Sequence, residues 1–371
     1  MEIPLYSIEV KEESKKIVLD VLNSGSLKQG KVTEKFESEF SKVFDVKYSV
    51  ATSSGTSALH LAVLSLFEKG DEVLVPSFTF FATASAVALS GLVPVFCDVE
   101  FDYFGIDLKD AERKISKKTK GIIPAHLFGV PQDIEEIEKF AKENNLKIIN
   151  DCAQSHGALW DGKNLASFGN CSIFSFYPTK NLFTGEGGMV CTNDIKIKEK
   201  VSYLRDHGMV SPYEHHFLGF NYRMTDIEAG IGIGQLSFFE EQLKKRRENY
   251  FYLKKNLEGI KQLGFQKVPK KATPGPSLLT CYLKEGSRDG FLKYLKEKGI
   301  GCAIYYPKPL NKQKVFIEMY GETDCPKADQ LSKVVFSLPT HHKLRKEEMD
   351  YIIEVVKDFF KWKQLRIQYV L

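Results

Sequence analysis

Short hydrophobic runs alternate with helical patterns over the first half of the chain, from about residue 47 to residue 192. Runs rich in Val and Ile, such as "EVLVPS" and "KIIND", are separated by helical stretches of roughly 10–15 residues, such as "DIEEIEKFAKENN". The strand runs are hydrophobic throughout, which is typical of parallel strands covered by helices on both faces. The pattern predicts an α/β fold, with α/β/α layers around a mostly parallel sheet.

The pattern changes after residue 192. "MTDIEAGIGIGQLSFFEEQLKKRRENYFYLKKNLEGI" predicts one or two long helices that bridge to a second unit. Beyond them we expect strands at "LLTCYL" and "IGCAIYY", a helix at "RDGFLKYLKEKG" and a final amphipathic helix at "KEEMDYIIEVVKDFFKWKQ". We therefore predict a large domain over residues 1–245, whose N-terminal segment can pack on the other unit, and a small α+β domain over residues 246–371.

Composition narrows the class of protein. The chain has 371 residues, 43% of them hydrophobic, which is enough for a large core and a second domain. Its net charge is only +4 and the charges are interleaved, so no nucleic-acid partner is expected. The seven cysteines form no CxxC pair, which argues against disulfides or a zinc ribbon and favours a reducing cytoplasm.

One long apolar run, "FTFFATASAVALSGLVPVF", approaches the length of a membrane span. It contains Ser, Thr, Gly and Pro and lacks basic flanks, so we interpret it as a helix followed by a buried strand. We expect no membrane association and no metal site.

Polar residues fall just beyond the predicted strands, at Ser53, Ser77, Asp98, His126 and Asp151. In an open α/β sheet the ligand crevice lies outside the carboxyl ends of the strands. The sequence therefore places its polar groups along one edge of the sheet.

"SSGTSALHLAVLSL" predicts a strand end, a turn and the start of a helix. Free backbone N–H groups and the helix dipole make such a start an anion site. Gly55 would allow close approach of the main chain, and the hydroxyl of Thr56 would add a donor. The same residues also suit a plain N-cap.

In "KIINDCAQSHG", Asp151 ends a buried strand, where a carboxylate is costly unless a cation meets it. A pyridinium nitrogen would serve, as would a salt bridge or a helix cap. Gln154 lies three residues on, where its side chain would reach the same ligand.

In "FSFYPTKNLFTGEGG", Lys180 is either a solvated lysine at a strand end or a desolvated amine able to form a Schiff base with an aldehyde. Ser175, at the strand end, would donate to a phosphate, and Phe80 would stack on a ring. A phosphate site, an acid and a reactive lysine together match the three demands of pyridoxal 5'-phosphate (PLP).

The motifs "SSGTSAL", "VPSFTFFATA", "DCAQSHG", "SFYPTKNLFTGEGG", "LRDHGM" and "GFNYRMTDIEAGIGIGQL" occur in this order. In these motifs the chain resembles the DegT-type (DegT/DnrJ/EryC/StrS) sugar aminotransferases, PLP enzymes of the aspartate aminotransferase fold. The resemblance covers nearly the whole chain and is strongest from residue 50 to residue 236.

The resemblance implies specific roles for residues of this sequence. It implies that Lys180 binds the PLP aldehyde and moves the proton, that Asp151 partners the pyridine nitrogen and that Gln154 contacts the ring hydroxyl. It further implies a stacking ring and a set of phosphate ligands, which would be Phe80, Gly55, Thr56 and Ser175, with Asn221 supplied by the neighbouring subunit of a homodimer.

The implied reaction is ping-pong transfer of the amino group of L-glutamate, through pyridoxamine phosphate, to a keto sugar on a nucleoside diphosphate. Candidate substrate contacts are Tyr6, His207, Tyr306 and Lys308. "IYYPKPLNKQ" resembles a family loop in which a histidine stands where this chain has Asn311, which puts the role of that position in doubt.

Three alternatives remain open. A sugar dehydratase on the same scaffold would replace the lysine, so Lys180 argues against it. A non-catalytic regulator would need a DNA-binding or partner element, and none is apparent. Amination of a keto acid in place of a keto sugar would require a residue that clamps the second carboxylate, for which Arg223 is available.

Overall fold

The computed structural model describes residues 1–368, with side chains described through residue 361. Its centre is a seven-stranded sheet in the order β1-β11-β10-β7-β6-β2-β3. Strands β10, β7, β6, β2 and β3 pair in parallel, and β11 runs antiparallel to both of its neighbours. The predicted α/β fold is confirmed. The strands are β1 (Tyr48–Thr52), β2 (Glu72–Pro76), β3 (Val93–Cys97), β6 (Thr119–Ile122), β7 (Lys147–Asp151), β10 (Cys171–Ser175) and β11 (Gly188–Thr192).

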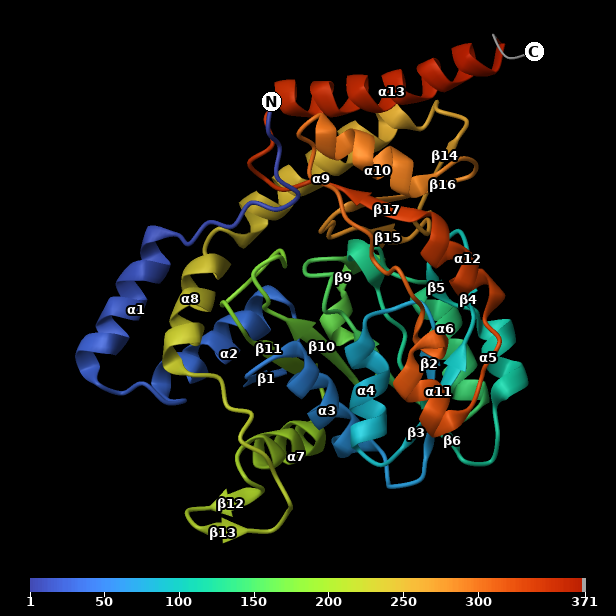
Figure 1. Cartoon of the computed structure of the whole chain (residues 1–371). Helices are drawn as coiled ribbons and strands as arrows, with labels where there is room; N and C mark the ends of the chain where they lie inside the picture. Colours follow the sequence, from blue (N-terminus) through green and yellow to red (C-terminus); the bar gives the residue numbers. More distant parts are fainter. Residues whose placement is uncertain (369–371) are drawn as a thin grey trace.

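Helices cover both faces of this sheet (Figure 1). Successive strand residues alternate between two cores, as the period of a strand requires: Val50 and Ile173 belong to one core, Ala51 and Phe174 to the other. The first core takes in α3 (Gly55–Leu66), α4 (Phe81–Leu89) and α7 (Ile195–Arg205). The opposite face is covered by α2 (Lys31–Val43), α5 (Leu108–Lys114), α6 (Ile134–Glu143) and α8 (Asp226–Leu236).

A second unit stands above one end of the sheet (Figure 1). It is an antiparallel sheet of β14 (Leu263–Phe265), β16 (Leu279–Leu283) and β17 (Val335–Leu338), packed on α9 (Phe239–Leu257), α10 (Arg288–Glu297) and α13 (Lys346–Gln368). Its core also includes Ile3.

The long helical segment predicted from the sequence forms two helices, α8 and α9. The domain division at residues 245 and 246 stays a prediction.

The predicted strand "IGCAIYY" is wrong. Only two isolated bridges occur there, from Ile300 to Ile3 and from Ala303 to Ser337. Because the two residues pair with different segments, no continuous ladder forms and the chain is free to bend toward the large sheet.

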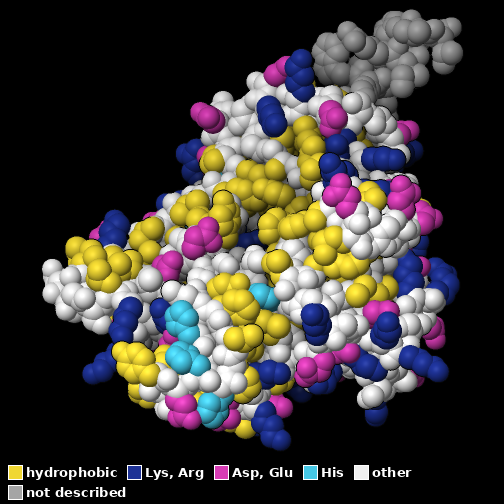
Figure 2. Space-filling view, turned by 60° about the horizontal axis from the view of Figure 1, so that its bottom comes forward, with side chains coloured by type: hydrophobic (Ala, Val, Ile, Leu, Met, Phe, Trp, Pro, Cys, Tyr) yellow, Lys and Arg dark blue, Asp and Glu magenta, His cyan; other side chains and the backbone are white. Residues whose placement is uncertain are grey.

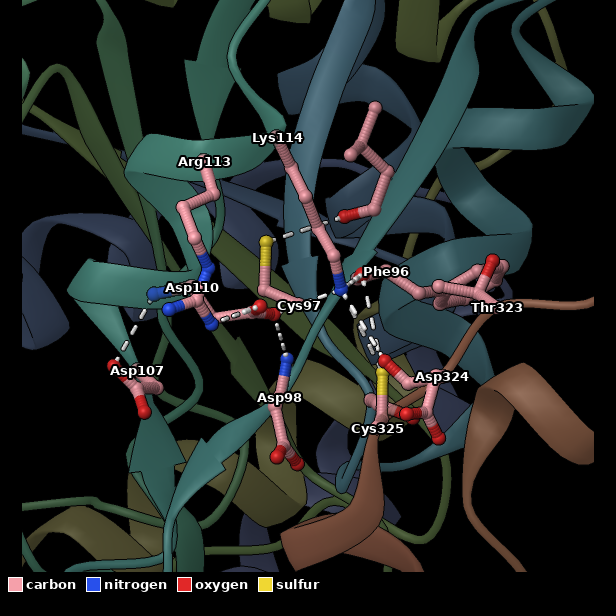
Figure 3. Close-up of polar contacts among 12 residues, drawn as sticks. Phe96, Cys97, Asp98, Asp107, Asp110, Arg113, Lys114, Thr323, Asp324 and Cys325 are labelled. Carbon is pink, nitrogen blue, oxygen red and sulfur yellow. Dashed lines mark hydrogen bonds and ion pairs between the residues drawn. The ribbon is translucent and has the colours of Figure 1, made fainter.

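The chain returns to the large unit after this bend, in α11 (Lys314–Tyr320) and α12 (Pro326–Val334). Figure 3 shows part of the contact. The Lys114 amine donates to the carbonyl of Phe96 at 2.8 Å and lies beside Cys325. The Asp98 carboxylate accepts from the first backbone N–H groups of α12, including that of Ala328 at 2.9 Å. The last third of the chain thus contributes to both units.

The other elements are short or peripheral. They are α1 (Glu12–Ser24), β4 (Val99–Glu100), β5 (Gly105–Ile106), β8 (Leu159–Trp160), β9 (Lys163–Asn164), β12 (Met209–Ser211), β13 (Glu214–His215), β15 (Ala272–Thr273) and the 3-10 turns Leu127–Gly129, Leu165–Ser167 and Leu310–Lys312. Within residues 1–368, none of the helices combines the length and hydrophobicity that a membrane span requires.

Candidate active site

A pocket of about 580 Å³ lies at the carboxyl ends of the parallel strands, a size typical of small-molecule sites. Figure 2 shows a hollow in this region, rimmed by hydrophobic side chains. The pocket brings together most of the residues predicted from the sequence: Tyr6, Gly55, Thr56, Phe80, Asp151, Gln154, Ser175, Lys180 and Tyr306. They come from segments far apart in the chain, which the parallel sheet gathers at one edge.

The turn from β1 to α3 forms one wall. Ser54 caps the helix in a capping box with Ser57, which leaves the N–H groups of Gly55 and Thr56 without an acceptor within residues 1–368. A Cβ at Gly55 would lie 2.7 Å from the Cβ of Ser175, so only glycine lets the turn approach β10 this closely. Likewise, a Cβ at Gly188 would lie 2.3 Å from the Ser54 carbonyl oxygen. The two glycines press an anion-binding turn against the strand ends.

Asp151 is a paired buried acid. It is 7% exposed, and its two oxygens accept hydrogen bonds from Thr83 Oγ1 at 2.8 Å and from the Ala153 N–H at 3.1 Å. Burial raises the pKa of the carboxyl, and the hydrogen bonds and Lys180 oppose that effect. A cationic ring nitrogen placed beside this group would favour its ionised form.

The Lys180 amine is partly buried and faces the same pocket. Burial lowers its pKa to about 8, although the charge of Asp151 acts in the opposite direction. Within the described residues no hydrogen bond or ion pair engages this amine. About a tenth of the amine is therefore an uncharged nucleophile at pH 7, far more than at the ordinary pKa of a lysine.

Gln154 is held in place from both ends. Its Oε1 accepts from the N–H of Phe128 at 3.0 Å, and its Nε2 donates to the Tyr306 hydroxyl at 2.6 Å. The Tyr306 ring lies 6.0 Å from the ring of Phe80, which is 55% exposed at the start of α4. Phe80 thus offers an open aromatic face to the pocket.

Several pocket residues were not among the predicted site residues. Tyr305 accepts a hydrogen bond from the Tyr6 hydroxyl at 3.0 Å, and Glu186 lines the pocket from the glycine-rich turn. His126 also lines it and is held neutral: its Nδ1 accepts from the Gln132 N–H at 3.1 Å, and burial lowers its pKa to about 4. The position of His126 just after a predicted strand was the sequence feature that could have identified it as a site residue.

Three predicted residues do not line the pocket of their own chain. His207 and Lys308 are exposed outside it, and Asn221 is exposed beside Asp206, with which it forms a β-bridge. Arg223, the alternative carboxylate clamp, is ion-paired to Asp206.

Asn311 lies outside the pocket as well. It is 2% exposed, accepts from the Ser77 hydroxyl at 2.5 Å and donates to the Thr323 carbonyl at 2.8 Å. This residue anchors the returning segment to the large sheet and does not face a substrate.

The donor set fits PLP. Free N–H groups at a helix start suit the phosphate, Asp151 suits the ring nitrogen, and the unengaged Lys180 amine suits the aldehyde. No cluster of His, Cys, Asp or Glu that would hold a metal occurs in the described part of the chain.

Comparison with known proteins points the same way. The profile of the DegT/DnrJ/EryC1/StrS aminotransferase family matches residues 8–357. A UDP-N-acetyl-3-dehydro-alpha-D-glucosamine 3-aminotransferase of Acidithiobacillus ferrooxidans is 37% identical over 91% of this chain and 91% of its own. A protein of Geobacillus stearothermophilus named pleiotropic regulatory protein is 34% identical over 97% of this chain and 99% of its own.

Among solved structures, the chain is similar to S. venezuelae DesV in complex with a ketimine intermediate. The TM-score is 0.91 at 28% sequence identity, with 96% of this chain and 99% of that chain covered.

Proposed function

The chain belongs to the DegT/DnrJ/EryC1/StrS aminotransferase family, whose members depend on PLP, and on this premise we propose that it transfers the amino group of L-glutamate to a nucleotide-linked keto sugar. The observation that carries the proposal is the presence of a weakly basic Lys180 amine and the buried Asp151 in one pocket. When bound, PLP supplies an aldehyde and an electron-withdrawing ring.

Each residue has a proposed task in this reaction. Lys180 would hold the aldehyde carbon of PLP and would take and return the substrate proton, for which a pKa of about 8 is well placed. Asp151 keeps the ring nitrogen protonated. Gln154 orients the ring hydroxyl, while the stacking and phosphate contacts come from Phe80, Gly55, Thr56 and Ser175.

The acceptor side of the pocket is rich in hydroxyl groups. Tyr6 and Tyr306 line it together with Tyr305, and phenols of this kind suit the hydroxyls of a sugar. The name of the Acidithiobacillus relative supports a keto sugar on a nucleoside diphosphate as the acceptor. The carbon that is aminated and the nucleotide are to be found by experiment.

We also propose a homodimer that works in the cytoplasm. Asn221 is exposed and does not line its own pocket, which suits a phosphate contact made to the pocket of a second copy. His207 and Lys308 are exposed as well. They would contact a substrate only in the pocket of a second copy, or after their own segments of the chain move.

The test is direct. The purified protein is incubated with L-glutamate and a panel of nucleotide-linked 3-keto and 4-keto sugars, and formation of 2-oxoglutarate is followed together with the mass of the sugar product. We expect 2-oxoglutarate and a sugar that has gained an amine. Loss of a sugar hydroxyl with no amine gained would identify a dehydratase instead.

A second function, regulation without catalysis, is favoured only by the name of the Geobacillus relative. It predicts that the Lys180→Ala protein keeps its regulatory effect and that no acceptor in the panel yields 2-oxoglutarate.

A further inference from the structure

Arg246 is a buried cation without a counter-ion among the described side chains. It projects from α9, is 4% exposed and does not line the pocket. Within the described residues its Nε and Nη1 atoms have no hydrogen-bond partner, and no carboxylate is close enough to form an ion pair with it. Burying a charge in this way is strongly unfavourable unless an opposite charge or hydrogen bonds compensate it.

Unpartnered polar atoms continue along the same face of α9. Gln242, Arg246 and Asn249 are spaced four and three residues apart, so they share one side of the helix, and all three are buried. In the described part of the chain, Gln242 Nε2 and Asn249 Oδ1 also lack a partner. Buried polar atoms are normally paired, so a row of unpaired ones calls for an explanation.

Three histidines lie within electrostatic range of Arg246. They are His156, just after β7, and His341 and His342, just after β17. Burial, with the charge of Arg246 adding to it, lowers their pKa values to about 3, 4 and 4, so all three are neutral at pH 7. His341 Nε2 donates to the Pro4 carbonyl at 3.1 Å, while His156 interacts with the backbone of Ser175. These three histidines with Gln242, Arg246 and Asn249 are here called the Arg246 cluster.

The charge of the cluster is positive. Two acids lie at its edge, and both are already paired. Glu9 is 3.5 Å from His342 Nε2 and is paired with Lys11 at 3.1 Å and Lys343 at 3.3 Å. Glu348, in electrostatic range of His341, is paired with Arg345 at 3.0 Å.

The free donors of the cluster are Arg246 Nε and Nη1 and Gln242 Nε2, to which His156 adds a single N–H. Asn249 Oδ1 and His341 Nδ1 are acceptors. Donors around one uncompensated positive charge suit an anion.

The cluster lies behind one wall of the active-site pocket. Asn249 Nδ2 donates to the His341 carbonyl at 2.9 Å, and His341 Nε2 contacts the carbonyl of Pro4 at 3.1 Å, two residues before Tyr6, which lines the pocket. Arg246 is also in electrostatic range of Tyr6. An anion held by Arg246 would therefore lie close to the reacting groups without displacing the PLP ligands.

We propose that the Arg246 cluster binds one small anion, either a halide or the carboxylate group of the amino-acid substrate, behind the Tyr6 wall of the pocket. The carboxylate source rests on the proposed function, whereas the halide source does not. Both sources share the same recognition: a single negative charge on the Arg246 guanidinium, with imidazole and amide N–H groups around it.

Bromide in crystals of the PLP-loaded enzyme tests the site directly. We expect one anomalous peak in contact with the Arg246 guanidinium when crystals are grown in sodium bromide. Bromide found only on the outer surface, with water against Arg246, would overturn the proposal. Since this measurement uses the unaltered protein and no substrate, it decides the site even if the panel of sugars shows no turnover.

Kinetics with L-glutamate distinguish the two sources. If the substrate carboxylate is the occupant, bromide competes with glutamate, and Arg246→Lys raises KM for glutamate about 10-fold while KM for the sugar is unchanged. If a halide is the occupant, the anomalous peak appears without competition. Lys245→Met is the matched control, because Lys245 is the preceding residue on α9 and is half exposed. If the crystals show no anomalous peak at Arg246 and bromide does not compete with glutamate, the proposed site is refuted.

Discussion

Asp151 and Arg246 are both buried charges beside the same pocket, yet their surroundings differ. Asp151 receives two hydrogen bonds and faces the lysine amine, whereas two nitrogens of Arg246 have no partner within residues 1–368. The carboxylate comes from the rigid end of a parallel strand, and the guanidinium comes from the helix that links the two units. The comparison teaches that the wall containing Asp151 is organised before any ligand binds, whereas the region around Arg246, behind the Tyr6 wall, holds a charge that has no partner.

The largest effect is expected at the amine that faces the organised wall. Lys180→Ala should lower the transamination rate by about 10³-fold or more, because both the covalent attachment of PLP and the proton transfer depend on Lys180. The measurement is 2-oxoglutarate formation, with borohydride trapping of PLP on the wild-type chain as a check. Full activity of the alanine variant would disprove the role of Lys180.

Asp151→Asn should come next. Removing the negative charge beside the ring nitrogen is expected to lower kcat by about 100-fold, because the carboxylate stabilises charge that develops in the ring. Asp226→Asn is the control, since Asp226 is 3% exposed and lies outside the pocket. Equal loss of activity in both variants would mean that stability, not catalysis, was affected.

Thr83→Val tests whether the pairing of Asp151 matters. Losing the 2.8 Å hydrogen bond to a charged oxygen should reduce kcat/KM about 10-fold and shift the absorption spectrum of bound PLP, and Thr83→Ser should restore both. A spectrum that stays unchanged in the valine variant would show that the hydroxyl does not orient the acid.

The pH dependence of PLP capture should report the pKa of Lys180. After removal of the cofactor, the capture rate should rise about tenfold per pH unit and level off above about pH 8, since only the neutral amine reacts. Because Asp151 raises this pKa, the Asp151→Asn chain should level off at a lower pH. A plateau reached only near pH 10 would mean that the amine is solvated.

The smallest effect is expected at Arg246, behind the Tyr6 wall of the pocket. In halide-free buffer, Arg246→Met should leave the free energy of unfolding unchanged or raise it by about 1 kcal/mol, because an uncompensated charge is removed. Thermal unfolding with and without bromide measures this, and the stabilisation by bromide should vanish in the variant. A large loss of stability without bromide would show that Arg246 is paired after all.

The organised wall could be predicted from the sequence to a large extent. Asp151, Ser175 and Lys180 follow hydrophobic runs, and parallel strands bring their carboxyl ends to one edge, so order along the chain was enough. The hydrogen bond of Thr83 to Asp151, across 68 positions, depends on how α4 sits over the sheet, which no local pattern encodes.

The region around Arg246 was less predictable. Arg246 stands in a run of basic residues that is typical of a solvated helix face, yet it is buried, because α9 packs against the cores of both units. "IGCAIYY" has the composition of a strand, but its residues find separate partners, so propensity alone gave the wrong element.

The return of α11 and α12 to the large sheet has a consequence for anyone who would cut the protein in two. The Asp98 carboxylate, in the first third of the chain, accepts its hydrogen bonds from the backbone of Lys327 and Ala328 in the last third. A fragment that stops near residue 245 would lack α11 and α12. It would expose to water the surface on which they pack, including Phe96, whose ring contacts Phe316. The coenzyme-binding half is therefore not a removable module, and libraries of chimaeras would need to exchange residues 304–334 together with the N-terminal half.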